Sequence, residues 1–172
     1  MSSLNLDPVA VERLASIPTK PVPEVCPHCG DAVVLAENAL VYGKPYGHWP
    51  YVYLCLNGRC GAYVGLHPGT TVPLGTLATA PMRKARKAVK DAFNPLWRGG
   101  GMRRGQAYAR LADAMGIPLE ECHIGWFDEA LCEQALKALA GGRLRQWTFY
   151  RFGSDDDDDN WGWLEPDDLG DK

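Results

Sequence analysis

The segment Cys26-Pro27-His28-Cys29-Gly30 decides how the first half of this chain folds. Two cysteines three positions apart, followed by glycine, are typical of a tight turn that points both thiolates at one ion. A second pair, Cys55 and Cys60, follows after 25 residues, which is long enough for intervening strands to bring the pairs together. Four thiolates complete the closed tetrahedral site of a structural zinc and leave no open position for catalysis. We therefore predict one structural Zn²⁺, held by Cys26, Cys29, Cys55 and Cys60.

The second pair leaves alternatives open, because four residues separate its cysteines. Three histidines compete as ligands, and these are His28, His48 and His67. The first pair alone also has the form of a redox Cys-x-x-Cys, although no βαβ pattern follows it. Cys122, His123 and Cys132 form a conceivable second metal site. Cys132 falls on the apolar side of a predicted helix, however, where a buried cysteine behaves as a small hydrophobe.

Residues 24–72 contain short β-rich runs separated by Gly, Pro and Asn turn signals. The predicted strands are residues 33–35, 40–42, 51–54 and 63–66. So small a sheet buries too little apolar surface to fold alone. A structural zinc contributes ~10–16 kcal/mol of apparent binding energy, so the metal is expected to hold this region together.

The rest of the chain is predicted to be mainly helical. Asp7 and Pro8 mark the start of a short first helix, and three prolines in residues 18–23 indicate a stiff linker. From Thr79 the apolar spacing becomes helical, and three helices are expected, the second at about 103–115 and the third at about 128–140.

The predicted fold class is α+β, with a small zinc β-ribbon, a three-helix segment and a disordered acidic C-terminal tail. Residues 143–152 alternate loosely and are expected to form a final strand. The expected organisation begins with an N-terminal helix and linker (1–20) and a zinc ribbon (21–76). A helical region packed on the ribbon (77–152) and the acidic tail (153–172) follow.

Charge is distributed very unevenly along the chain, although the net charge is only −3. Residues 81–110 contain nine lysines and arginines and one acid, Asp91, whereas residues 153–172 contain nine acids and one base, Lys172. A basic block and an acidic tail imply different partners. The basic residues that we expect to contact phosphates are Arg83, Arg86, Lys87, Lys90, Arg98, Arg103 and Arg104. The alternative for this face is a solvated helix surface.

The acidic tail has two functional interpretations besides a solubilising role. It can compete with nucleic acid for the basic face, or it can bind a partner protein through Trp161, Trp163 and Leu164. The run of five aspartates before these residues favours disorder when the chain is alone.

Several motifs resemble a zinc-finger-containing family found in bacteriophages and prophages. Besides the first cysteine pair, they are residues 41–47 (Val-Tyr-Gly-Lys-Pro-Tyr-Gly), 60–67 (Cys-Gly-Ala-Tyr-Val-Gly-Leu-His) and 73–78 (Pro-Leu-Gly-Thr-Leu-Ala), and the resemblance covers about residues 24–140. It implies a zinc ribbon with the same four cysteine ligands, in a mobile-element setting. Where family members carry His-x-x-Phe-Asp, this chain has Lys90-Asp-Ala-Phe93-Asn94, so no acid–base role is expected there.

These observations favour a binding protein over an enzyme. The sequence has no P-loop, dinucleotide fingerprint or HExxH motif. We therefore expect no small-molecule substrate. It has no secretory signal and no membrane-spanning run, so we expect a cytoplasmic protein that does not enter a membrane. The leading hypothesis is a nucleic-acid-binding accessory protein of phage type, for DNA or RNA. The alternative is a non-enzymatic phage effector that binds and inhibits a host protein complex, as an interaction or DNA-mimic module.

Overall fold

A computed structural model describes residues 4–99 and 101–141 of the chain. This described part divides into two compact units, residues 4–80 and residues 81–141, each with its own hydrophobic core. The first unit contains a small antiparallel sheet and the second is helical, which confirms the predicted α+β class. The predicted strand at 143–152 and the acidic tail lie outside the described residues.

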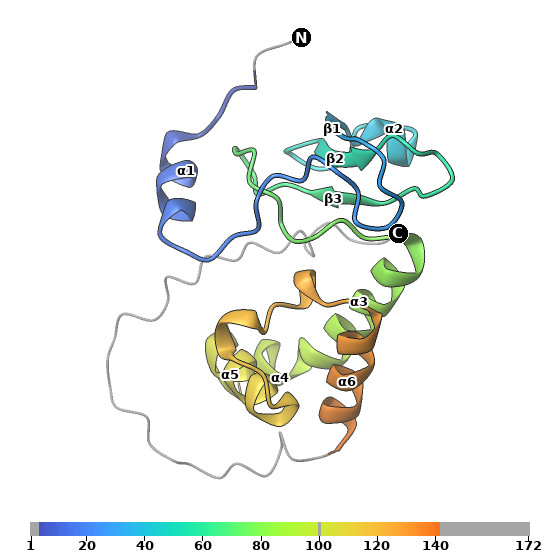
Figure 1. Ribbon diagram of the computed structural model, residues 1–172. Helices are drawn as coiled ribbons and strands as arrows, with labels where there is room; N and C mark the ends of the chain where they lie inside the picture. The colour runs from blue at the N-terminus through green and yellow to red at the C-terminus, as the bar shows by residue number, and fades with distance from the viewer. Residues whose placement is uncertain (1–3, 100, 142–172) are drawn as a thin grey trace. The chain divides into compact units, whose positions relative to one another are not determined.

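Three short strands form the sheet of the first unit (Figure 1). They are β1 (Val33–Glu37), β2 (Tyr51–Cys55) and β3 (Tyr63–Gly65), antiparallel and in the order β1-β2-β3. The register pairs Val33 with Cys55 and Val52 with Gly65. These strands confirm three of the four predicted runs.

One face of this sheet carries much of the core of the first unit. Successive side chains of a strand point to opposite faces, and one face carries Tyr53, Cys55 and Val64, all buried in the core of the first unit. The same core contains Cys26, the first predicted zinc ligand, which is only 1% exposed. Two of the zinc ligands, Cys26 and Cys55, are thus part of the core of the first unit, and Cys60 packs against it.

The predicted strand at residues 40–42 is wrong, because the structure has a short helix there, α2 (Ala39–Tyr42). The backbone N–H groups of Val41 and Tyr42 both donate to the carbonyl of Asn38, and Gly43 ends the turn with φ +76°. The buried Asn38 side chain binds Tyr46 through two hydrogen bonds, from Asn38 Nδ2 to Tyr46 O (2.7 Å) and from Tyr46 N to Asn38 Oδ1 (3.0 Å). A three-residue apolar run is too short to distinguish a strand from a helical turn.

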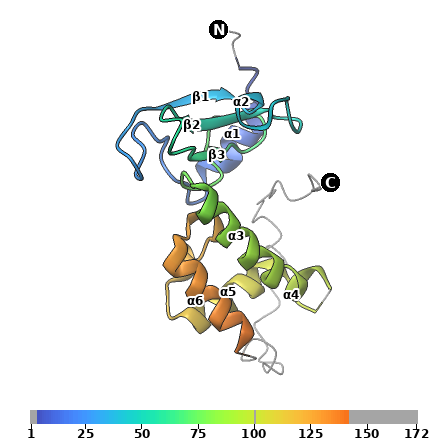
Figure 2. The same ribbon diagram turned by 90° about the vertical axis from the view of Figure 1, so that its right-hand side faces the viewer.

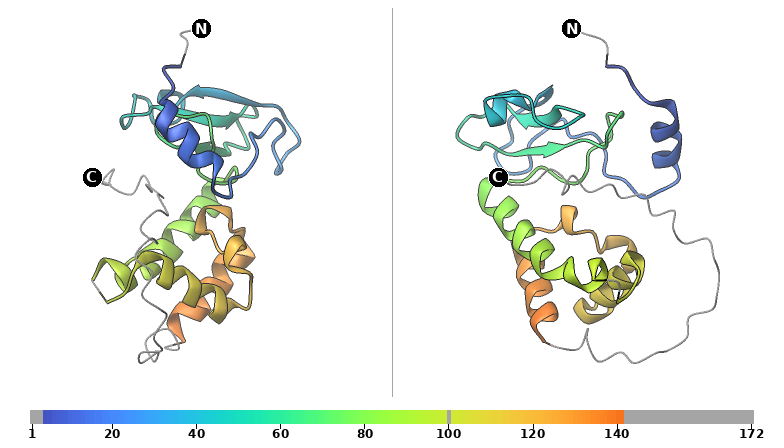
Figure 3. Two further views of the ribbon diagram at one scale, coloured as in Figure 1. Left: turned by 90° about the vertical axis from the view of Figure 1, so that its left-hand side faces the viewer. Right: turned by 180° about the vertical axis from the view of Figure 1, so that it is seen from behind.

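The first helix, α1 (Pro8–Ala15), packs on the loop that follows β3 (Figure 3). As predicted, the Asp7 side chain caps it by accepting from the Val9 N–H at 3.0 Å. The Asp7 N–H donates to the carbonyl of Gly69 at 2.8 Å, and Ala10 and Leu14 are buried. Gly69 has φ +74°, and a Cβ there would lie 2.7 Å from the Asp7 Cβ. Glycine is therefore required at this contact.

Four helices and two 3₁₀ turns form the described part of the second unit (Figure 2). The helices are α3 (Ala80–Phe93), α4 (Pro95–Arg98), α5 (Arg104–Met115) and α6 (Glu129–Ala140). The turns Leu119–Glu121 and Ile124–Trp126 connect α5 to α6. The three predicted helices are confirmed, and α4 is an additional turn.

The core of the second unit is built around two buried phenylalanines, Phe93 and Phe127. The Phe93 ring lies 4.6 Å from the Tyr108 ring, centroid to centroid. Asp128 caps α6, at the position where the third helix is predicted to begin, by accepting from the Leu131 N–H at 2.7 Å. None of the described helices is long and apolar enough to cross a membrane.

Candidate metal centre

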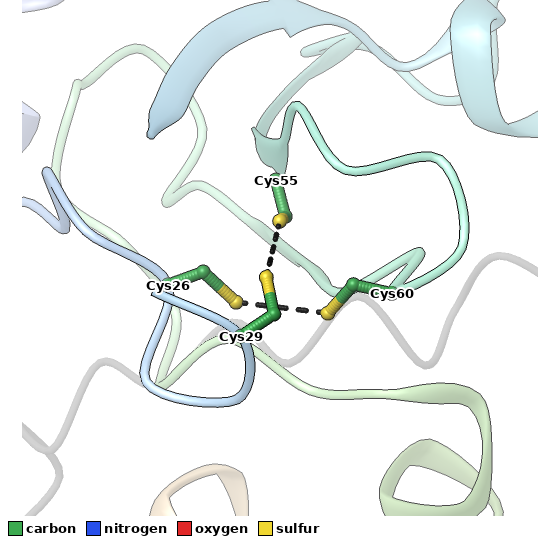
Figure 4. A group of neighbouring side chains, drawn as sticks. All are labelled: Cys26, Cys29, Cys55 and Cys60. Carbon is green, nitrogen blue, oxygen red and sulfur yellow. Dashed lines mark hydrogen bonds between the residues drawn. The ribbon is translucent and has the colours of Figure 1, made fainter. Parts of the chain in front are cut away.

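The four predicted zinc ligands converge in space (Figure 4). Their Sγ atoms all lie within 4.8 Å of one another, with 3.4 Å between Cys29 and Cys55 and 3.7 Å between Cys26 and Cys60. Four sulfurs at about 2.3 Å from a tetrahedral Zn²⁺ are separated by about 3.8 Å. The arrangement therefore fits one zinc ion with four thiolate ligands.

Two turns aim these side chains. In the first, the Gly30 N–H donates to Cys26 O (2.9 Å) and the Cys26 N–H donates to Asp31 O (2.8 Å). In the second, the Cys60 N–H donates to Asn57 O at 3.0 Å. This turn explains how a spacing of four residues still serves the metal, because it brings Cys60 back toward Cys55.

Backbone N–H groups and neighbouring thiols set the ionisation of the cluster. Burial opposes ionisation of Cys26, but the N–H groups of His28 and Cys29 donate to its sulfur, and its pKa is lowered on balance. The Asp31 N–H favours the Cys29 thiolate, but desolvation and the thiols of Cys55, Cys26 and Cys60 raise the pKa of Cys29 to about 12. Four thiolates at such distances repel one another unless a cation is bound. The donor set is therefore that of a single structural Zn²⁺.

None of the three competing histidines belongs to this group. His28 Nε2 lies 3.0 Å from the carbonyl oxygen of Leu77, which accounts for its position beside the cluster. His48 is exposed and His67 is buried, and in the described part of the chain only the four cysteines form a metal-binding group.

The conceivable second metal site around Cys122 and Cys132 is not formed in the described residues. Both cysteines are buried in the core of the second unit. Burial raises the pKa of Cys122 to about 12 and also raises that of Cys132. They act as small apolar side chains in this core.

A small antiparallel sheet closed by two cysteine turns defines a structural zinc-binding module of the zinc-ribbon class. The model of a family described as a zinc-finger-containing domain matches residues 22–141, and the chain belongs to this family. The match includes the whole of the second unit that the structure describes and leaves out α1. Among curated proteins and among solved structures, nothing matches the chain.

The predicted phosphate-binding residues of α3 do not share one environment. Lys87 is exposed and lies 3.3 Å from Asp91, and Arg83 and Lys90 are half-buried. Arg86 is only 8% exposed, and its Nε donates to the carbonyl of Phe127 at 2.7 Å. Burial lowers the pKa of Arg86 to about 10. Arg86 thus links α3 to Phe127, the residue before the α6 N-cap, and little of its side chain is accessible to a phosphate.

Two of the remaining three predicted cations, Arg98 and Arg104, lie over Trp97. The guanidinium carbons of Arg98 and Arg104 each lie 5.3 Å from the Trp97 ring centroid, and that of Arg104 lies 5.6 Å from the Tyr108 ring. Arg103, at the N-cap of α5, is exposed. This stacking was missed by the sequence analysis, because Trp97 and Arg104 belong to different helices. The predicted partner-binding residues Trp161, Trp163 and Leu164 lie outside the described residues.

Proposed function

We propose that this protein is a zinc-ribbon accessory protein of phage or prophage type whose helical unit binds nucleic acid in the host cytoplasm. The observation that carries the proposal is the charge of residues 81–110, with nine lysines and arginines against one acid. Cations at this density attract the phosphate backbone independently of base sequence. The zinc centre has a structural role in this account.

The contacts within the second unit support two groups of phosphate ligands. One is the flank of α3 with Arg83, Lys87 and Lys90, which lie within one narrow sector of the helix. The other consists of Arg98 and Arg104, which lie over Trp97, together with the exposed Arg103 at the N-cap of α5. Lys87 already pairs with Asp91, but an exposed i,i+4 ion pair is worth only about 0.3–0.5 kcal/mol. A phosphate can therefore replace that partner at little cost.

The acidic tail is proposed to oppose this binding. Its nine acids within residues 153–172 form a polyanion that competes with nucleic acid for the cations. The competition weakens as salt screens it.

The test is the salt dependence of binding to labelled DNA and RNA, for the full chain and for a chain ending at Gly153. Each phosphate contact on duplex DNA contributes about −0.9 to the slope of log affinity against log salt. The three cations of the α3 flank alone predict a slope of about −3. The shortened chain should bind more tightly, most clearly at low salt.

Charge reversal locates the surface. Arg83→Glu with Lys87→Glu should remove most of the salt-dependent affinity. Lys137→Glu is a control for a single charge reversal, because Lys137 is exposed on α6 and pairs with Glu133 outside the basic block. If the shortened chain binds no nucleic acid in a salt-dependent way, the proposal is wrong.

A second candidate, an effector that binds a host protein complex, is favoured by exposed apolar side chains at the Val34 end of the sheet face opposite Tyr53 and Cys55. The register pairs Val34 with Leu54. Ala32 and Leu56 follow on the same face, joined by a hydrogen bond from Leu56 N to Ala32 O. Val25 is bridged to Ala32. Val25, Val34 and Leu56 are 62%, 37% and 60% exposed. Contiguous exposed apolar side chains mark interaction surfaces. Leu56→Glu should then abolish binding of a host complex and leave nucleic-acid affinity unchanged.

A further inference from the structure

Two side chains join the metal-binding turns outside the ligand set. Asn57 Nδ2 donates to Asp31 Oδ2 at 2.6 Å. Asp31 follows the first cysteine pair and Asn57 lies inside the second, so this hydrogen bond connects two turns that are 26 residues apart in sequence.

The two residues occupy equivalent positions. Asp31 is the second residue after Cys29, and Asn57 is the second residue after Cys55. The backbone N–H of each donates to the sulfur of the cysteine before it. The sulfurs of the two cysteines that precede them, Cys29 and Cys55, lie 3.4 Å apart.

Asn57 also shapes its own turn. Its Oδ1 accepts from the Arg59 N–H at 3.0 Å, and its backbone carbonyl accepts from Cys60. Asp31 Oδ2 lies 3.7 Å from Cys29 Sγ, the one exposed sulfur ligand. The side-chain bond therefore restrains the ligand that solvent reaches most easily.

We propose that Asp31 and Asn57 are positioning residues that hold the two metal-binding turns together and set the rate at which zinc leaves the site. Outer hydrogen bonds orient metal ligands, and their loss typically costs 10–100-fold in metal affinity. When the bridge breaks, Cys29 and Cys55 move independently, and a chelator gains access at the exposed Cys29 side. This role of the bridge at the metal centre is independent of nucleic-acid binding.

The experiment measures the rate of zinc transfer from the full-length zinc-loaded protein to an excess of a chromogenic chelator. Asn57→Asp keeps an oxygen that accepts from Arg59 but places two carboxylates face to face, so zinc should leave at least about tenfold faster. Asp31→Asn keeps the acceptor for the Asn57 amide and should release zinc at nearly the wild-type rate. Asn5→Asp and Glu37→Gln are exposed controls in the same unit with matched charge changes.

The decisive variant combines Asp31→Asn with Asn57→Asp. The amide introduced at position 31 can donate to the carboxylate introduced at position 57, so the bridge is restored with reversed polarity. Slow release should return in this double variant, and the cobalt-substituted protein should keep the absorption of four thiolate ligands throughout. The proposal is overturned if Asn57→Asp releases zinc like the wild type, or if the double variant is as fast as Asn57→Asp. If Asn57→Asp retains no zinc at all, recovery of zinc binding in the double variant supports the bridge, and continued loss overturns it.

Discussion

Truncation of Phe93 tests whether its buried ring stabilises the second, helical unit. Phe93 is 1% exposed, ends α3, and packs its ring 4.6 Å from that of Tyr108. Phe93→Ala removes a fully buried ring, which typically lowers the free energy of unfolding by ~3–5 kcal/mol. A unit of this size has only about 3–9 kcal/mol of stability. The variant should therefore leave the helical unit marginally folded or unfolded.

The assay is urea unfolding followed by far-ultraviolet circular dichroism, with metal content measured in parallel. Phe93→Leu should lower the free energy of unfolding by a smaller amount, about 1 kcal/mol, because it conserves most of the apolar volume. Leu119→Ala is the control, since Leu119 is 45% exposed and its loss should cost within about 0.5 kcal/mol. Zinc should remain bound in all three variants, because no ligand belongs to the core that contains Phe93. A loss below about 1 kcal/mol in Phe93→Ala would contradict the packing described here.

Three further perturbations test other parts of the account. Asn38→Ala leaves the backbone groups of Tyr46 without their side-chain partners and should lower the free energy of unfolding of the first unit by ~1–3 kcal/mol, with exposed Asn5→Ala as the control. Gly69→Ala should release α1, because the new Cβ meets Asp7, and hydrogen exchange of residues 8–15 should accelerate while zinc stays bound. Zinc affinity should fall as pH falls from about 8 to about 6, because zinc binding must displace protons from the thiols. The pKa of Cys29 is about 12 without metal, so its thiol is protonated throughout this range. An affinity that does not change with pH would contradict this.

The metal site could be predicted from the sequence because its signal is local. Two paired cysteines fix both the ligand type and the turn that presents it, and the strands between them follow from β-rich runs and turn residues. The α6 cap at Asp128 was predictable for the same reason, since an N-cap is decided within one helical turn.

The errors arose where distant contacts decide the outcome. Residues 40–42 have the composition of a strand, but the buried Asn38 and its bonds to Tyr46 favour a helical turn. Arg86 lies beside the apolar side of its helix, and its hydrogen bond to the carbonyl of Phe127, 41 residues away, could not be read from the sequence. The Asp31–Asn57 bridge left a weak signal, because both residues stand second after a ligand cysteine, but their pairing depends on the folded turns.

Metal stoichiometry of the purified full-length chain tests the central claim most directly. We predict one zinc per chain, and a cobalt-substituted form whose absorption shows four thiolate ligands from Cys26, Cys29, Cys55 and Cys60. Cys29→Ser should lose the metal, and the sheet of the first unit should unfold with it. A wild-type protein that is stably folded in the first unit without any metal would contradict the account.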